Sequence, residues 1–283
     1  MSLILSKLAA ETAAKAREQQ YHVFGKDLHI VCDTEPRGHA LPENRSPLEH
    51  RIHTTEGFVP LWDQGQTLRW HFQERSFANF AYPEELKSVI RQLFGEALNA
   101  WGDAAPIRFN EQEDAWDFQI SVKSEKDCDI NGCVAASAFF PDDGRHDFVV
   151  YPSLFDLDPA EQVETLIHET GHIFGLRHWF ANISEAFSPS VQFGSDSKFT
   201  VMNYGDKSVF TNADTEDLAR LYENAWAGML TEINGTPIRF VRPYHVKRYL
   251  EENSVASRLL QPASVLQRIR NLMAFESSSR LTN

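Results

Sequence analysis

The segment HETGHIFGLRH, residues 168–178, brings three histidines and one glutamate close together in the chain. His168 and His172 are four residues apart, so on a helix both imidazoles project from the same side and can reach one ion. Gly175 can adopt the positive φ that ends a helix and turns the chain, which would bring His178 to the same point. The segment therefore predicts a helix that ends in a three-histidine metal site.

The ligand set points to zinc and to catalysis. Three neutral imidazoles leave a tetrahedral zinc ion with one open position, which holds water. Zinc lowers the pKa of that water from about 15.7 to about 7. Glu169 follows the first ligand and is placed to take the proton and pass it to a leaving amine. We therefore expect one catalytic zinc ion on His168, His172 and His178, with Glu169 as general base and then acid.

Patterns in the rest of the chain predict a sheet and three helices, one of which carries the histidines. Residues 68–72 alternate apolar and polar side chains, as expected for a strand with one buried and one solvent-exposed face. Residues 83–101 carry apolar side chains at helical spacing. The histidine-bearing helix has a recognisable start. Asp158 is expected to be its N-cap, Pro159 its first helical residue and Glu161 the partner of Asp158 in a capping box. Further strands are expected around residues 118–122, 133–140 and 147–152, a third helix over 211–226, and a strand over 238–243.

Composition excludes several kinds of partner. The chain has 283 residues, 42% hydrophobic, and a formal net charge of −13, so it predicts a globular protein without the basic excess that nucleic acid binding needs. No apolar run is long enough for a membrane span, and no signal peptide is recognised at the N-terminus. The expected location is the cytoplasm, or the outside by a non-classical export route. No feature of the sequence indicates the oligomeric state.

The three cysteines leave two readings open. Cys128 and Cys133 are close in sequence and Cys32 stands alone. A disulfide between the first two and a pair of reduced thiols beside a turn are equally compatible with this spacing.

The motif HETGHIFGLRH resembles the extended zinc motif of the metzincin metalloproteases, and the resemblance covers about residues 58–226. It implies an α/β (α+β) fold with a twisted mixed sheet, a long first helix, an active-site helix and a C-terminal helix. It also implies a methionine turn under the site, a part that Met202 of TVMNYG takes. Tyr204 stands where astacins and serralysins have a tyrosine that can bind zinc and stabilise the oxyanion. The family is mostly secreted, which favours an extracellular location.

Two other segments resemble the matrixins within this clan. NGCVAASAFFPDDGRHDF, residues 131–148, is similar to their edge strand and following loop, and TEDLARLYE, residues 215–223, to their closing helix. An edge strand there would receive an extended peptide by strand addition. The residues expected to do so are Ala135, Ala136, Ser137 and Ala138. The histidines of the matrixin structural zinc site are reduced to DDGRHD, so a second zinc ion is not expected.

Matrixin and astacin proenzymes block their zinc with a cysteine or an aspartate of the propeptide. By that resemblance, Cys32 or Asp27 is a candidate latch, although VCDTEPRG departs from the matrixin motif. The loop DCDING, residues 127–132, begins like a calcium-binding loop but has Ala138 where a bidentate glutamate is required, so Ca²⁺ is the weaker prediction.

The expected protein is a zinc-dependent endopeptidase that acts on peptide or protein substrates. Its predicted parts are an N-terminal arm over residues 1–57 that could serve as a pro-segment, a catalytic domain over 58–226 and a C-terminal extension over 227–283. Two alternatives keep the zinc. One is a hydrolase of a small amide, and the other is a binding module that uses the metal only for stability.

Overall fold

The computed structural model describes residues 30–32, 34, 50–53, 57–128, 132–178, 190–194, 200–203 and 210–259. The chain divides into two compact units after Pro243. Asp27 and Tyr204 lie outside the described residues.

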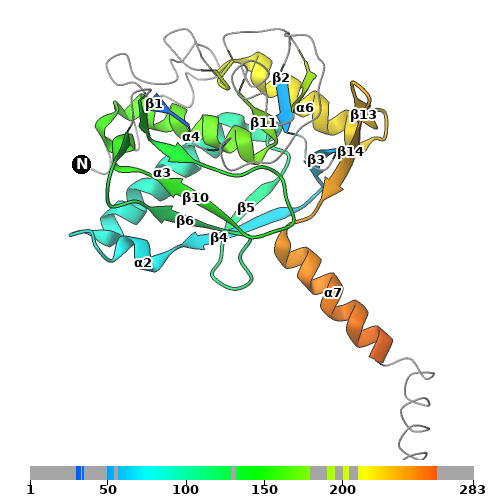
Figure 1. The fold of residues 1–283 in the computed structure, drawn as a ribbon, viewed down its shortest axis with the longest axis horizontal. Helices are drawn as coiled ribbons and strands as arrows, with labels where there is room; N and C mark the ends of the chain where they lie inside the picture. The colour runs from blue at the N-terminus through cyan, green and yellow to red at the C-terminus, as the bar shows by residue number, and fades with distance from the viewer. Residues whose placement is uncertain are drawn as a thin grey trace, which may run out of the picture. The chain divides into compact units, whose positions relative to one another are not determined.

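A five-stranded mixed sheet forms the centre of the first unit, with the strand order β5-β4-β6-β10-β9 (Figure 1). The bounds are β4 Thr67–Phe72, β5 Arg108–Glu111, β6 Phe118–Val122, β9 Ala136–Ser137 and β10 His146–Val150. β5, β4, β6 and β10 run parallel, and β9 pairs antiparallel with β10. The alternation expected in β4 is confirmed, because Leu68, Trp70 and Phe72 are buried while the residues between them are partly exposed.

Two long helices, α3 (Pro83–Trp101) and α4 (Pro159–Ile173), lie on the same side of this sheet (Figure 1). Phe94 of α3 makes edge contacts with Trp70, Phe118 and Phe148, which rise from three neighbouring strands. Such aromatic pairs add to the free energy gained by burying their area. The predicted α/β fold with a mixed sheet, a long first helix and a helix that carries the histidine motif is confirmed.

The third expected helix is α6 (Asn212–Trp226), which begins with a capping box made by Thr211 and Asp214. Shorter helical turns connect the larger elements. They are α2 Glu74–Phe77, η2 Gly102–Ala104 and η3 Pro152–Asp156.

Three small sheets join distant parts of the chain. Their orders are β1-β8-β7, β11-β2-β12 and β13-β14-β3. Their bounds are β1 Ile30–Val31, β2 His50–His53, β3 Val59–Trp62, β7 Asp127–Cys128, β8 Cys133–Val134, β11 Leu176–Arg177, β12 Ser190–Phe193, β13 Glu232–Ile233 and β14 Thr236–Val241. Two strands of the predicted arm, β1 and β2, are thus paired with strands of the predicted catalytic domain. The strand expected over 238–243 is β14, which runs parallel to β3.

A disulfide joins Cys128 and Cys133 across the β7–β8 pair, which decides between the two readings of these cysteines. The described part of the second unit is the helix α7 (Tyr244–Leu259). None of the helices in the described ranges has the length and apolar content needed to cross a membrane.

Candidate metal centre

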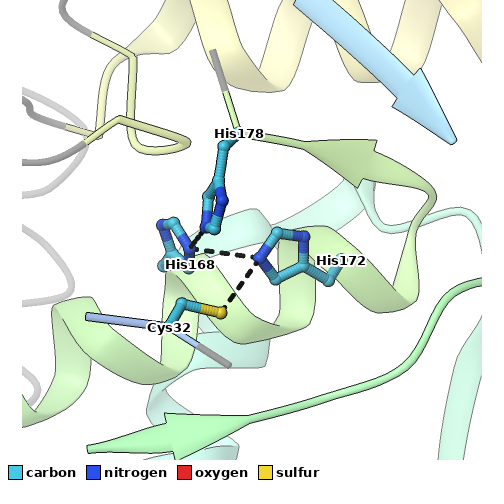
Figure 2. A group of neighbouring side chains, drawn as sticks. All are labelled: Cys32, His168, His172 and His178. Carbon is cyan, nitrogen blue, oxygen red and sulfur yellow. Dashed lines mark hydrogen bonds between the residues drawn. The ribbon is translucent and has the colours of Figure 1, made fainter. Parts of the chain in front are cut away.

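The helix α4 carries His168, Glu169 and His172 in its last two turns, and all three are buried. Its start is fixed as expected, because Asp158 and Glu161 form a reciprocal capping box. After the helix, Gly175 has φ +92°, a conformation that favours glycine. The chain then reverses into β11, and His178 comes directly after this strand. Figure 2 shows the three imidazoles converging on one point.

The reversal after α4 is held by two aromatic side chains from other elements. Trp62 of β3 donates its indole N–H to the Ile173 carbonyl at 2.7 Å, and Tyr222 of α6 donates its hydroxyl to the Phe174 carbonyl at 3.1 Å. These bonds satisfy carbonyls that the end of a helix leaves without intrahelical partners. Complete burial raises the pKa of Tyr222, so the phenol stays a donor. The turn that presents His178 is therefore fixed from both sides.

Backbone carbonyls orient two of the imidazoles. His168 Nδ1 lies 2.8 Å from the Val201 carbonyl, and His172 Nδ1 lies 2.7 Å from the Leu176 carbonyl. A carbonyl only accepts, so each Nδ1 carries the proton and each Nε2 keeps its lone pair. Such second contacts are usual for metal-bound histidines, since they fix the tautomer and the ring direction.

The Nε2 atoms form a cluster that fits a metal ion. His168 Nε2 lies 3.2 Å from His172 Nε2 and 3.0 Å from His178 Nε2. The Nε2 lone pairs of His168 and His172 face each other, so this contact cannot be a hydrogen bond between neutral rings. A cation bound between the two nitrogens would remove the repulsion between these lone pairs. Two nitrogens bound to tetrahedral zinc at about 2.05 Å are about 3.3 Å apart, close to the observed spacing.

Cys32 from the N-terminal arm completes this group (Figure 2). Its Sγ lies 3.4 Å from His172 Nε2, and the ligand atoms of Cys32 and the three histidines all lie within 4.8 Å of one another. The preceding strand β1 runs parallel to β8, with Ile30 opposite Cys133 and Val31 opposite Val134. This pairing brings Cys32 to the histidines across more than a hundred residues of chain.

Glu169 faces the same arm. Its Oε2 accepts a hydrogen bond of 3.0 Å from the Thr34 hydroxyl, and that hydroxyl accepts one of 2.8 Å from the Ala138 N–H. The predicted edge residues Ala135, Ala136, Ser137 and Ala138 are buried, and β9 within them is an outer strand of the central sheet among the described residues.

The turn containing Met202 lies against α4 at Gly171. Met202 is fully buried, and its Sδ lies 2.6 Å from the position that a Cβ on Gly171 would occupy. Trp101 of α3 closes this region, since its indole N–H lies 2.9 Å from the Thr170 hydroxyl and 3.1 Å from the Ile167 carbonyl. Gly171, which lies between Glu169 and His172 in the sequence, is thus the point where the sulfur approaches the helix backbone.

Asp214 of α6 ties this turn to the body of the unit. Its Oδ1 accepts hydrogen bonds from the Thr200 hydroxyl and from the Val201 N–H at 3.4 Å. Its Oδ2 accepts from both the N–H and the hydroxyl of Thr211 at 2.8 Å. Because the Val201 carbonyl orients His168, Asp214 supports the metal centre indirectly.

Sequence reasoning did not single out Thr34 or Asp214. Asp214 had a local signal, because Thr211 and Asp214 have the spacing of a capping box at the start of α6. Thr34 had none, since its partners Glu169 and Ala138 are 135 and 104 residues away in sequence. Of the calcium-loop residues, Asp129 and Asn131 lie outside the described part, as do the latch candidate Asp27 and the oxyanion candidate Tyr204.

Comparisons with known proteins identify a family for the chain. Residues 62–208 match the family model described as Matrixin, a range that includes half of the chain. The chain is 28% identical to human stromelysin-3 (Homo sapiens) over 122 residues and 27% identical to the mouse protein (Mus musculus) over 122 residues. Each alignment covers 39% of this chain and 25% of the relative, so the chain matches about a quarter of the length of these relatives.

Two solved structures are similar at low identity. A crystal structure of myroilysin is 14% identical, with a TM-score of 0.40 over 71% of this chain and 93% of the other. The hatching enzyme zinc-protease HCE-1 of Oryzias latipes is 12% identical, with a TM-score of 0.31 over 65% of this chain and 98% of the other.

Proposed function

We propose that this chain, which belongs to the matrixin family, is a zinc-dependent endopeptidase. The resemblance to the metzincins noted from HETGHIFGLRH is confirmed at the level of this family. The observation that carries the proposal is the convergence of three imidazole nitrogens beside a buried glutamate. The predicted division into an arm, a catalytic domain and an extension at residues 57 and 226 stays a prediction.

His168, His172 and His178 would hold the zinc ion through their Nε2 atoms. The support is the tautomer of two of these rings, which turns their lone pairs toward the cluster. When bound, zinc supplies a Lewis acid that polarises the scissile carbonyl and acidifies water. Calcium has no comparable support in the described residues. Of the loop expected to bind it, residues 127–132, the structure describes only residues 127, 128 and 132.

Glu169 would act first as the general base and then as the general acid. Its position on α4, directly after a ligand, lets its carboxylate take a proton from the attacking water and deliver it to the leaving amine. Burial excludes competing solvent from this carboxylate. Tyr204 would donate its phenol hydroxyl to the oxyanion, and Met202 would form the apolar floor below the histidines.

The substrate would be an extended peptide bound along residues 135–138. The support is that β9 has a strand partner on one side only among the described residues. Backbone N–H and C=O groups there can add a strand, which binds a peptide with little regard to its sequence. Protein substrates therefore fit this edge better than a small amide does.

Cys32 would be the latch that keeps the site inactive. Four ligands, one thiolate and three imidazoles, complete a tetrahedral zinc shell and leave no open position. A sulfur and a nitrogen of such a shell are about 3.6 Å apart, near the 3.4 Å between Cys32 Sγ and His172 Nε2. The alternative latch Asp27 lies outside the described residues.

The test compares cleavage of denatured casein by the zinc-loaded full chain in a Cys32→Ala background, with and without Glu169→Gln. Loss of the general base is expected to lower the rate by about 10² to 10⁴ at unchanged zinc content. Glu164→Gln is the matched control, because Glu164 is a buried glutamate on the same helix, one turn before His168. It is expected to cut like its parent, and a chelator should stop both.

The other outcomes identify the alternatives. A protein that binds one zinc ion and hydrolyses small amides but not casein would be the small-amide hydrolase. A protein that binds zinc and loses thermal stability with chelator, yet hydrolyses neither substrate, would be the binding module.

A further inference from the structure

We propose that Thr34 is a second inhibitory contact of the N-terminal arm, one that blocks the general base and the substrate edge without using the metal. The inference rests on the proposed function, because that proposal assigns Glu169 as the base and residues 135–138 as the substrate edge. It adds to the Cys32 latch a contact of different chemistry. The two contacts come from residues that are only two positions apart.

The hydrogen bonds of the Thr34 hydroxyl have fixed directions. A carboxylate only accepts, so the hydroxyl proton goes to Glu169 Oε2 at 3.0 Å. A backbone N–H only donates, so the hydroxyl oxygen accepts from Ala138 at 2.8 Å. Thr34 is 2% exposed, which means that water does not compete strongly for either bond. One hydroxyl thus holds the base and the substrate edge together.

Thr34 also supports the thiol next to it. Its backbone N–H lies 3.4 Å from Cys32 Sγ, and its hydroxyl lies 3.2 Å from the same sulfur. The hydroxyl proton is committed to Glu169, so the N–H is the donor that can stabilise a thiolate at Cys32. The side-chain hydroxyl and the backbone N–H of one residue therefore serve two different blocking contacts.

This arrangement has a direct chemical consequence. To work as a base, Glu169 needs an acceptor lone pair for the proton of water, and an incoming peptide carbonyl needs the Ala138 N–H. Thr34 takes one lone pair of Glu169 Oε2 and the whole Ala138 N–H. Loss of the Cys32 contact alone therefore leaves the site partly blocked, whereas loss of both contacts opens it.

The Thr34→Val substitution isolates the hydroxyl, because valine keeps the shape and removes its hydrogen bonds to Glu169 and Ala138 together with its contact to Cys32 Sγ. A hydrogen bond to a charged group contributes about ten- to hundredfold to an equilibrium constant. We expect Thr34→Val to raise the population of the open arm by this factor. Thr34→Ser keeps the hydroxyl and should behave like the unchanged protein.

Cys32 offers a readout of arm opening that does not depend on activity. The chain has three cysteines and two of them form the disulfide, so Cys32 is the single thiol that iodoacetamide can alkylate. The alkylation rate is measured on the full chain, both zinc-loaded and chelator-treated. We expect Thr34→Val to raise the rate about ten- to hundredfold in both states. Thr165→Val, which removes a buried hydroxyl bonded to the Glu161 carbonyl, should stay within about twofold of the unchanged protein.

A double-mutant cycle with Glu169→Ala then tests whether Thr34 holds the arm through its hydrogen bond to Glu169. If Thr34 acts through Glu169, then Thr34→Val accelerates alkylation much less in the Glu169→Ala background than alone. An unchanged rate for Thr34→Val would overturn the proposal. Equal acceleration by Thr34→Ser and Thr34→Val would also overturn it, because the methyl group and not the hydroxyl would then hold the arm.

Cleavage separates this inference from the proposed function. With zinc bound, we expect the double variant Cys32→Ala, Thr34→Val to cut denatured casein at least about tenfold faster than Cys32→Ala. If neither variant cuts while the alkylation rates follow the prediction, the endopeptidase proposal fails and the Thr34 contact stands. If both cut at the same rate and alkylation is unaffected by Thr34→Val, the contact fails and the endopeptidase stands.

Discussion

Asp214→Asn tests whether the turn under the metal centre is held from α6. The carboxylate is 2% exposed and accepts four hydrogen bonds, two at each oxygen. Two of the donors are hydroxyls, on Thr200 and Thr211, and two are backbone N–H groups, on Val201 and Thr211. Asparagine keeps the shape but offers one acceptor oxygen and one NH₂ group.

The expected loss of stability follows from these donors. The hydroxyls can rotate and accept from the new NH₂ group, but a backbone N–H cannot accept. Whichever way the amide lies, one backbone N–H faces a donor and remains buried without its bond. Losing one hydrogen bond to a charged acceptor and leaving its donor unsatisfied costs about 2 to 4 kcal/mol of unfolding free energy.

The metal centre should weaken as well. The Val201 carbonyl orients His168, and loss of such a supporting contact typically lowers metal affinity by about 10- to 100-fold. We would measure zinc affinity by competition with a chromophoric chelator and stability by urea unfolding. Asp217→Asn is the matched control, because Asp217 is a buried carboxylate on the same helix that pairs with Arg220. It should lower stability without changing zinc affinity. An Asp214→Asn protein that binds zinc as tightly as its parent would refute the reasoning.

Three further substitutions test other parts of the structure. Gly171→Ala places a Cβ 2.6 Å from the sulfur of buried Met202, so we expect a loss of about 1 to 3 kcal/mol in urea unfolding, and an unchanged midpoint would contradict the contact. Ile52→Pro removes an N–H from β2, the middle strand beside β11, so zinc affinity and melting temperature should both fall, and calorimetry that finds neither would exclude β2 as a support of His178. Burial raises the pKa of Glu164 from 4.5 to about 9, so between these values the unfolded chain releases a proton that the folded protein keeps, and stability falls as pH rises. Glu164→Gln should remove this fall, about 4 kcal/mol between pH 5 and 8, and equal pH slopes for both proteins would be the contrary result.

The parts of the fold that follow from local patterns were predictable. The helix at residues 83–101 and the capping box of α4 depend on neighbours within a few positions, and both have the expected form. Pairings between distant strands were not predictable in this way. The parallel pairs β1–β8 and β3–β14 join segments about 100 and 180 residues apart, and a strand of two residues has no period to read.

The same division applies to the metal centre. His168, His172 and His178 fall within one helix and its turn, so their spacing alone predicts that they meet. Thr34 reaches Glu169 only because β1 pairs with β8, and nothing in the residues around Thr34 specifies that partner. The contacts between the arm and the site were therefore the least accessible part to sequence reasoning.

The two described pieces of the arm have opposite proposed effects on the centre. Residues 30–32 and 34 place Cys32 and Thr34 against the histidines and Glu169, where we propose that they block it. Residues 50–53 pair with β11, the strand that leads directly to His178. A truncation after residue 57 would remove the block and the neighbour of β11 together, and its inactivity would say nothing about the latch. Opening the site requires release of residues 30–34 while β2 stays in its sheet, so a chain that begins between residues 35 and 49 is the form in which full activity is expected.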